Sequence, residues 1–255
     1  MCNVIRVTMP FWNEFTHGQF LSECKNTNIA VFVTGSLEAH GRHLPLGTDT
    51  ILPEHLAKHI AENTEAVVLP TIPFGDSWIF NQFQGTISVQ PKTLIDFYTD
   101  IMKGVFIHGF KYIVALNGHG GNTPHLESAA RLATKKGERV VIIINWWRDL
   151  AKDVRNELVE TPMGHAGEDE TSEMLFVRPD LVDMQSANPA RVATRYRVVS
   201  AWYREELYPK ATYGDPTKAT AEKGKAIMEQ AKQEIITLIE ELEMGKLPLN
   251  ERSQD

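Results

Sequence analysis

The stretch of sequence that decides the fold is IAVFVTGSLEAHGRHLPLGTDT, residues 29–50. Its first part, Ile29–Thr34, is apolar and mostly β-branched, which is typical of a strand buried on both faces of a parallel sheet. The loop that follows carries four side chains of types that bind divalent metals, namely Glu38, His40, His43 and Asp49. Because open α/β sheets bind ligands at the carboxyl ends of strands, the stretch predicts a metal site at the edge of a parallel sheet.

The rest of the chain alternates short apolar runs with segments of helical length. Further strands are predicted at Ala66–Pro70, Tyr112–Asn117 and Val140–Asn145. Helices are predicted at Thr50–Asn63, Pro91–Gly109 and Pro124–Lys136, each with a proline near its start. This alternation predicts an α/β fold, a three-layer α/β/α sandwich with a mostly parallel central sheet.

No internal repeat, low-complexity tract or linker divides residues 1–255, so we expect a single domain. Near its end, residues 217–244 carry apolar side chains at helical spacing. They predict a long amphipathic helix that packs on the sheet or on a neighbouring subunit. Residues 188–215 are irregular and rich in Arg, Tyr and Pro, a composition that suits a lid or an oligomer contact.

Composition excludes several classes of protein. The 255-residue chain has 42% hydrophobic and 23% charged residues, as ordinary soluble globular proteins do, and its formal net charge of −7 argues against a general nucleic-acid surface. The longest apolar run, at 140–147, is far shorter than the roughly 20 residues that span a bilayer. The chain has no secretory signal and only two cysteines, Cys2 and Cys24, so a reduced cytoplasmic protein is favoured over one with a disulfide.

The first cluster admits two interpretations. Side chains two apart on extended backbone share a face, so Glu38 and His40 could each hold one metal ion or share one. Asp49 could bridge two ions through its two carboxylate oxygens. Alternatively, these are turn and cap residues, with Asp49 as a helix N-cap.

A second cluster, NGHGGN at 117–122, follows a predicted strand. Its glycines let the backbone turn sharply and approach a ligand, while His119 is presented at the strand end. A phosphate-binding loop or a plain tight turn would have similar glycines. The lack of a Lys-Ser/Thr pair argues against a P-loop.

A third cluster, GHAGEDETSE at 164–173, combines a histidine with several acids. Acids at a helix start interact favourably with the helix dipole, which accounts for some of them but not for His165 beside glycines. A carboxylate here could complete a metal site, and His165 could move protons. The remaining histidines have no motif around them and are interpreted as structural.

Together, GSLEAHGRHLPLGTD, LNGHGGN and GHAGEDETSEM resemble the signature blocks of the creatininase (creatinine amidohydrolase) family, in the same order. The resemblance implies an α/β/α sandwich, two divalent metal ions per subunit (Zn, Mn or Fe) and hydrolysis of a C–N amide bond. It also implies a homo-oligomer, often a hexamer, that acts on a small-molecule amide.

The resemblance also assigns roles by position. Glu38, Asp49 and His119 would hold one metal ion. His40, Asp49 and Glu170 would hold the other, which makes Asp49 the bridge. His165 would be the catalytic proton shuttle, and Glu168 would be a ligand or a general base. Because this ligand set is complete without His43, that histidine would lie next to the ligands or face the substrate.

The chain departs from creatinine-hydrolysing members of the family at two positions. These members carry a bulky residue and a Glu where this chain has Gly120 and Gly121. The glycine pair resembles the wider family, which includes formamide hydrolases and peptide-processing enzymes. We therefore expect a cyclic amide or a formamide rather than creatinine, bound near Gly120, Gly121 and Trp146, with Trp147 as a further candidate wall.

Two other functions are compatible with the same residues. A non-catalytic metal-binding scaffold or regulatory subunit would keep the fold, although the complete ligand set argues against it. Phosphoester hydrolysis is open to a two-metal site. It is disfavoured because Arg42 is the only basic residue close to the clusters in the sequence.

Overall fold

A computed structural model describes residues 11–249 and shows a four-stranded sheet in the order β2-β1-β3-β4, with every pairing parallel. The strands are β1 (Ile29–Thr34), β2 (Val67–Val68), β3 (Tyr112–Asn117) and β4 (Val140–Asn145). Three of them have the predicted bounds. The prediction for β2 was too long, because Pro70 has no N–H to donate and the pairing with β1 becomes irregular after Val68.

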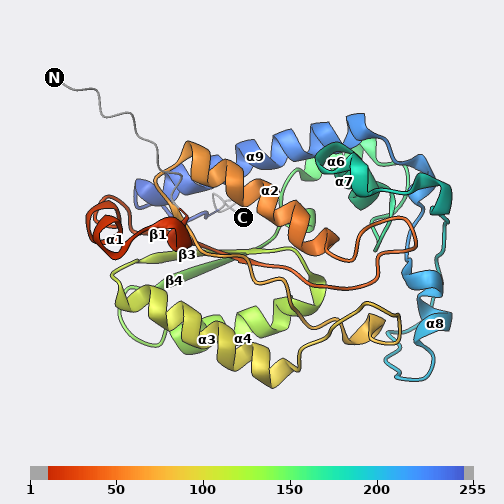
Figure 1. The fold of residues 1–255 in the computed structure, drawn as a ribbon, viewed down its shortest axis with the longest axis horizontal. Coiled ribbons are helices and arrows are strands. Elements are labelled where there is room, and N and C mark those ends of the chain that lie inside the picture. Colours follow the sequence, from red (N-terminus) through yellow and green to blue (C-terminus); the bar gives the residue numbers. More distant parts are fainter. Residues whose placement is uncertain (1–10, 250–255) are drawn as a thin grey trace, which may run out of the picture.

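Helices cover both faces of this sheet and confirm the predicted α/β fold (Figure 1). On one face lie α2 (Thr48–Asn63), α6 (Lys152–Leu158), α7 (Glu168–Val177) and α9 (Ala221–Glu243), and on the other lie α3 (Pro91–Ile107) and α4 (Thr123–Ala133). Shorter helices are α1 (His17–Glu23), α5 (Trp146–Asp149) and α8 (Arg204–Leu207). Among residues 11–249, no helix combines the length and apolarity needed to cross a bilayer.

The predicted long C-terminal helix begins later than expected. Residues Pro216–Lys218 form a separate 3-10 turn, and α9 begins after Thr220, whose side chain accepts a hydrogen bond from the Lys223 N–H. Gly224, in the first turns of α9, lets this helix approach α7 closely. A Cβ atom there would lie 1.9 Å from the Ser172 carbonyl oxygen.

The sheet separates two apolar layers. Ile29, Val31 and Val33 face the layer beneath α2 and α9, whereas Ala30 and Phe32 face the layer beneath α3 and α4. This alternation follows from the two-residue period of a strand. Because both faces are covered, the strands are apolar throughout, as the sequence pattern indicated.

A buried group of charges joins α6 to α7. The Arg155 side chain, 5% exposed, contacts the carboxylates of Glu173 and Asp169, and its guanidinium carbon lies 5.1 Å from the centre of the Trp146 ring. Burial raises the pKa of Glu173 to about 8, although the nearby Arg155 opposes this shift. Arg155 therefore compensates two carboxylates that have little access to water.

We expect Arg155→Met to lower the free energy of unfolding by about 3–5 kcal/mol, because it leaves buried carboxylates without a counter-charge. The loss should be larger at pH 8 than at pH 5. Without the guanidinium, the pKa of folded Glu173 rises further above its unfolded value. A raised carboxyl pKa favours the folded state at low pH, where the carboxyl is protonated, and this stabilisation is lost as the pH rises. Urea unfolding at both pH values measures this difference.

The matched control is Lys152→Met, which removes an exposed charge from the same helix. It should change the unfolding free energy by less than about 0.5 kcal/mol. Equal effects of the two substitutions would contradict a compensating role for Arg155.

Candidate metal centre

The three predicted clusters meet at the carboxyl ends of β1 and β3. Glu38 and His40 lie in the loop after β1, and Asp49 lies in the first turn of α2. His119 follows β3, and Glu170 lies in the first turn of α7. Parallel strands end at the same edge of a sheet, so residues far apart in the sequence come together here.

Asp49 lies between the two halves of the cluster. Its Oδ1 atom is 3.0 Å from His40 Nε2, and its Oδ2 atom is 2.8 Å from His119 Nδ1. The interpretation of Asp49 as a helix N-cap is wrong, because Gly47 occupies that position. Ser36 Oγ donates a hydrogen bond of 2.8 Å to Oδ2 and helps to hold the carboxylate in this orientation.

Two groups of donor atoms share Asp49. Glu38, Asp49 and His119 form one, and His40, Asp49 and Glu170 form the other, with the donor atoms of each group within 4.8 Å of one another. These are the two sets that the family resemblance implied. Glu38, His40 and His165 form a further group at the same distance limit.

Backbone carbonyls orient all three histidines. His40 Nδ1 lies 3.0 Å from the Glu38 carbonyl oxygen, His119 Nε2 lies 2.9 Å from that of Asp76, and His165 Nε2 lies 2.8 Å from that of Ala39. A carbonyl only accepts hydrogen bonds, so each of these nitrogens carries the proton. The opposite nitrogens of His40 and His119 face carboxylate oxygens, which raise the pKa of His40 above its usual value and that of His119 to about 9, although burial opposes both shifts. Each of these nitrogens would give up its proton to bind a metal ion.

The cluster concentrates negative charge in a buried place. The Glu38 side chain is 1% exposed, its Oε2 atom has no hydrogen-bond partner, and burial raises its pKa to about 7. Among the described residues, no Lys or Arg forms an ion pair with Glu38, Asp49 or Glu170. Buried carboxylates need a compensating charge. The residues therefore fit divalent cations.

His165 lies against the cluster and beside an aromatic wall. Its ring stacks on Phe80, with centres 4.1 Å apart, and lies 4.2 Å from the His40 ring. Its Nδ1 atom is 3.8 Å from Glu38 Oε1. Burial and the neighbouring His40 lower the pKa of His165 to about 4.

The contacts of Glu168 are directed away from the cluster. Its carboxylate accepts hydrogen bonds from the backbone N–H groups of Glu160 and Thr161 and forms an ion pair with Lys223, whose Nζ lies 2.7 Å away. These contacts tie the start of α7 to α9. They do not favour Glu168 as a ligand or a general base.

The two tryptophans have different environments. Trp146 is 2% exposed and packs in the core against Arg155, so the structure does not place it on a substrate surface as predicted. Trp147 lies beside Gly120, where an added Cβ atom would be 3.8 Å from its ring. His43 Nε2 lies 2.9 Å from Thr171 Oγ1, and this hydrogen bond links the loop after β1 to α7.

Sequence reasoning missed Asp76 and Ser36, which position His119 and Asp49. Asp76 lies beyond β2, and its carboxylate lies 2.8 Å from His125 Nε2 on α4. The only signal was a short polar stretch, Gly75–Ser77, after a predicted strand. Such stretches are too common to single out without the structure.

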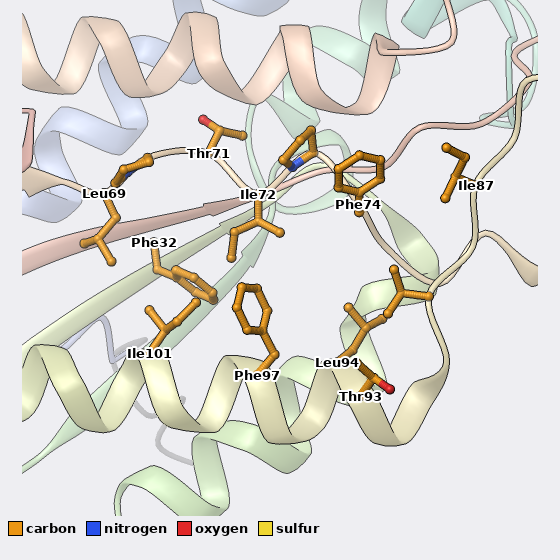
Figure 2. Close-up of a pocket in the computed structure, with 13 residues that line it drawn as sticks. Phe32, Leu69, Thr71, Ile72, Phe74, Ile87, Thr93, Leu94, Phe97 and Ile101 are labelled. Carbon is orange, nitrogen blue, oxygen red and sulfur yellow. The ribbon is translucent and has the colours of Figure 1, made fainter. Parts of the chain in front are cut away.

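An apolar pocket of about 890 Å³ lies elsewhere, between α3 and the segment after β2 (Figure 2). Phe97 and Ile101 of α3 and Ile72 and Phe74 of the opposite segment contribute to its lining. No charged side chain lines it, and it contains none of the predicted site residues. This pocket therefore offers no charged or metal-binding side chain.

The glycine pair after His119 gives a test of the local geometry. A Cβ atom at Gly121 would lie 2.1 Å from the Asp76 carbonyl oxygen and 2.5 Å from His119 Nε2. We expect Gly121→Ala to displace His119 and to destabilise the protein by about 1–3 kcal/mol. At Gly120 the nearest atom is 3.8 Å away, so Gly120→Ala should be tolerated. Thermal unfolding measures both, and equal stability of the two variants would contradict this packing.

The family model described as creatinine amidohydrolase matches residues 13–239. Creatinine amidohydrolase of Pseudomonas putida is 29% identical over 250 residues, which cover 90% of this chain and 94% of the relative. Mycofactocin precursor peptide peptidase of Mycolicibacterium smegmatis is 32% identical over 209 residues and 76% of each chain.

The solved structures agree with this relationship. A creatininase structure with Mn superposes with a TM-score of 0.83 at 28% identity, over 92% of this chain and 98% of that one. The related enzymes named here are hydrolases, one of creatinine and one of a peptide. From the extent of the family match and the shared fold, this chain belongs to the creatinine amidohydrolase family.

Proposed function

We propose that this protein is a metal-dependent amidohydrolase that cleaves a C–N amide bond, cyclic or in a formamide, of a small molecule. The observation that carries the proposal is the pair of donor groups that share Asp49. Glu38, Asp49 and His119 would hold one divalent ion, and His40, Asp49 and Glu170 would hold the other. Nitrogen and oxygen donors of this kind suit Zn, Mn or Fe.

Two bound cations would supply Lewis-acid chemistry, which activates water and polarises the amide carbonyl. The chain itself supplies the proton transfer. His165 keeps its Nε2 proton on the Ala39 carbonyl, so its Nδ1 atom is free to accept a proton beside Glu38. The same atom can then deliver that proton to the leaving nitrogen. The stacked Phe80 ring holds the imidazole in place and excludes water from one of its faces.

Local shape supports a substrate other than creatinine. Gly121 has no room for a side chain, and Gly120 leaves open space in front of Trp147. Small amides can approach the backbone in this space. We propose Gly120 and Gly121 as substrate-contact residues, with Trp147 in place of Trp146.

The non-catalytic scaffold is the alternative, and no described contact favours it. A scaffold has no need for a histidine whose Nδ1 atom is left free to accept a proton beside the cluster, as that of His165 is. A homo-oligomer and a cytoplasmic location stay predictions.

The bridging role of Asp49 can be tested by Asp49→Asn, which keeps the size of the side chain and removes its charge. The wild-type protein should hold two metal ions per chain, and the variant should lose at least one of them. Its turnover of small amides and formamides should fall at least roughly 100-fold. Metal content is measured by elemental analysis, and turnover by the release of amine or formate.

Glu54→Gln is the matched control, because Glu54 is exposed on the same helix. It should keep both the metal content and the turnover of the wild type. Retention of both ions and full turnover by Asp49→Asn would refute the bridging role. A metal-loaded wild type that hydrolyses no amide in the panel would favour the scaffold.

A further inference from the structure

Residues 188–215 return to the metal centre and form one of its walls. Tyr213 and His165 exchange two backbone hydrogen bonds of 2.8 Å, and the Gly41 N–H donates one of 2.8 Å to the Ala211 carbonyl. The Tyr208 ring lies edge-on to Phe80, 5.3 Å between centres, and Phe80 stacks on His165. Figure 1 shows α8, in this segment, at the end of the sheet where the strand-end loops lie.

This wall carries a cation that is held over an aromatic ring. The guanidinium carbon of Arg204, on α8, lies 4.0 Å from the centre of the Trp78 ring. Trp78 is two residues beyond Asp76, whose carbonyl orients His119. Arg204 is thus connected to the metal centre through Trp78 on one side and, one turn later, through Tyr208 and Phe80 on the other.

Arg204 has no anionic partner among the described residues. No side chain there forms an ion pair or a hydrogen bond with it, and its Nε atom is buried without an acceptor. Glu205 and Glu206 follow it on the same helix, but both are exposed and neither pairs with it. Buried donors in proteins are almost always satisfied, so an acceptor from outside the described residues, water or a bound anion, would satisfy this Nε–H group of the half-buried Arg204 side chain.

Two more cations flank the same edge. Arg42 follows Gly41, and Lys210 precedes Ala211, the two residues joined by the backbone hydrogen bond described above. Both side chains are exposed and have no ion-pair partner within residues 11–249. With Arg204, they place three cations on the segments that border the metal centre, beside the exposed acids Glu205 and Glu206.

We propose that Arg204, held over Trp78, binds an anionic group of the amide substrate, a carboxylate or a phosphate monoester. This inference rests on the proposed amidohydrolase function and assigns the substrate class for that site. The guanidinium presents a planar fork that matches the oxygens of either anion, and its contact with the Trp78 ring restrains the side chain. An anion held there keeps the rest of the substrate beside the metal centre. Sequence reasoning identified only Arg42 near the clusters, because Arg204 is distant along the chain.

The test compares pairs of formamides in which one member carries an anionic group and the other is neutral. N-formylglycine is paired with N-formylglycinamide, and the phosphate monoester of N-formylethanolamine is paired with N-formylethanolamine. Dissociation constants are measured by calorimetry on the metal-loaded protein, and hydrolysis is measured by formate release. The wild type should bind at least one anionic probe about tenfold or more tightly than its neutral counterpart. The pair that shows the difference identifies the anion.

Arg204→Met should reduce this ratio toward one, and Arg204→Lys, which keeps the charge but loses the fork, should give an intermediate ratio. Arg195→Met is the control, since Arg195 is exposed on the same segment and lies over Tyr196 instead. It should keep the wild-type ratio. Metal content and thermal unfolding of each variant verify folding. If Arg204→Met does not fold, Arg204→Lys alone decides the outcome.

A wild-type ratio in the folded Arg204 variants would overturn the proposal, because the metal ions themselves would then be selecting the anion. A wild type that binds both probes of each pair equally would also overturn it. Formate release separates the two proposals. Hydrolysis without charge preference would contradict the anion site alone. Charge-dependent binding without hydrolysis would support the anion site and contradict the amidohydrolase function.

Discussion

Burial of carboxylates beside one another is the constraint on which the rest of this structure depends. Glu38, Asp49 and Glu170 lie together at the sheet edge, and no Lys or Arg of the described chain neutralises them. Charges of like sign removed from water are stable only with a compensating cation. By contrast, the Asp169 and Glu173 carboxylates have Arg155 as a permanent partner. The first group fits a cation from outside the chain, whereas the second has its counter-charge within the chain.

The parallel sheet makes this arrangement possible. The ends of three adjacent strands are in register and polar, with Thr34 Oγ1 donating to Asn117 Oδ1 and Asn117 Nδ2 donating to Asn145 Oδ1. These bonds hold the strand ends in a row. The loops beyond them supply both carboxylates and the backbone carbonyls that orient the imidazoles. Loop positions can therefore carry reactive groups without losing their geometry.

Much of the fold and of the site could be predicted because the signals were local. Apolar runs identified the strands, and His119 was recognisable because glycines follow a strand end. Predictions of individual roles failed where the local sequence was compatible with two environments for the same side chain. Glu168 is one of several acids at the start of a helix, and the local sequence does not distinguish them. Its ion pair with Lys223, which is distant along the chain, directs its carboxylate away from the cluster. Of the two adjacent tryptophans, Trp146 is directed into the core by its position at the end of β4.

The sequence by itself determined the elements, the parallel sheet and the residue types of the candidate ligands, because periodicity and motif spacing are properties of short stretches. Only the tertiary structure decided which oxygen of Asp49 faces which histidine, and which nitrogen of each ring donates to a backbone carbonyl. It alone brought Arg204 to the edge of the site. These facts depend on contacts between segments that are distant in the sequence, and no local pattern encodes such distances.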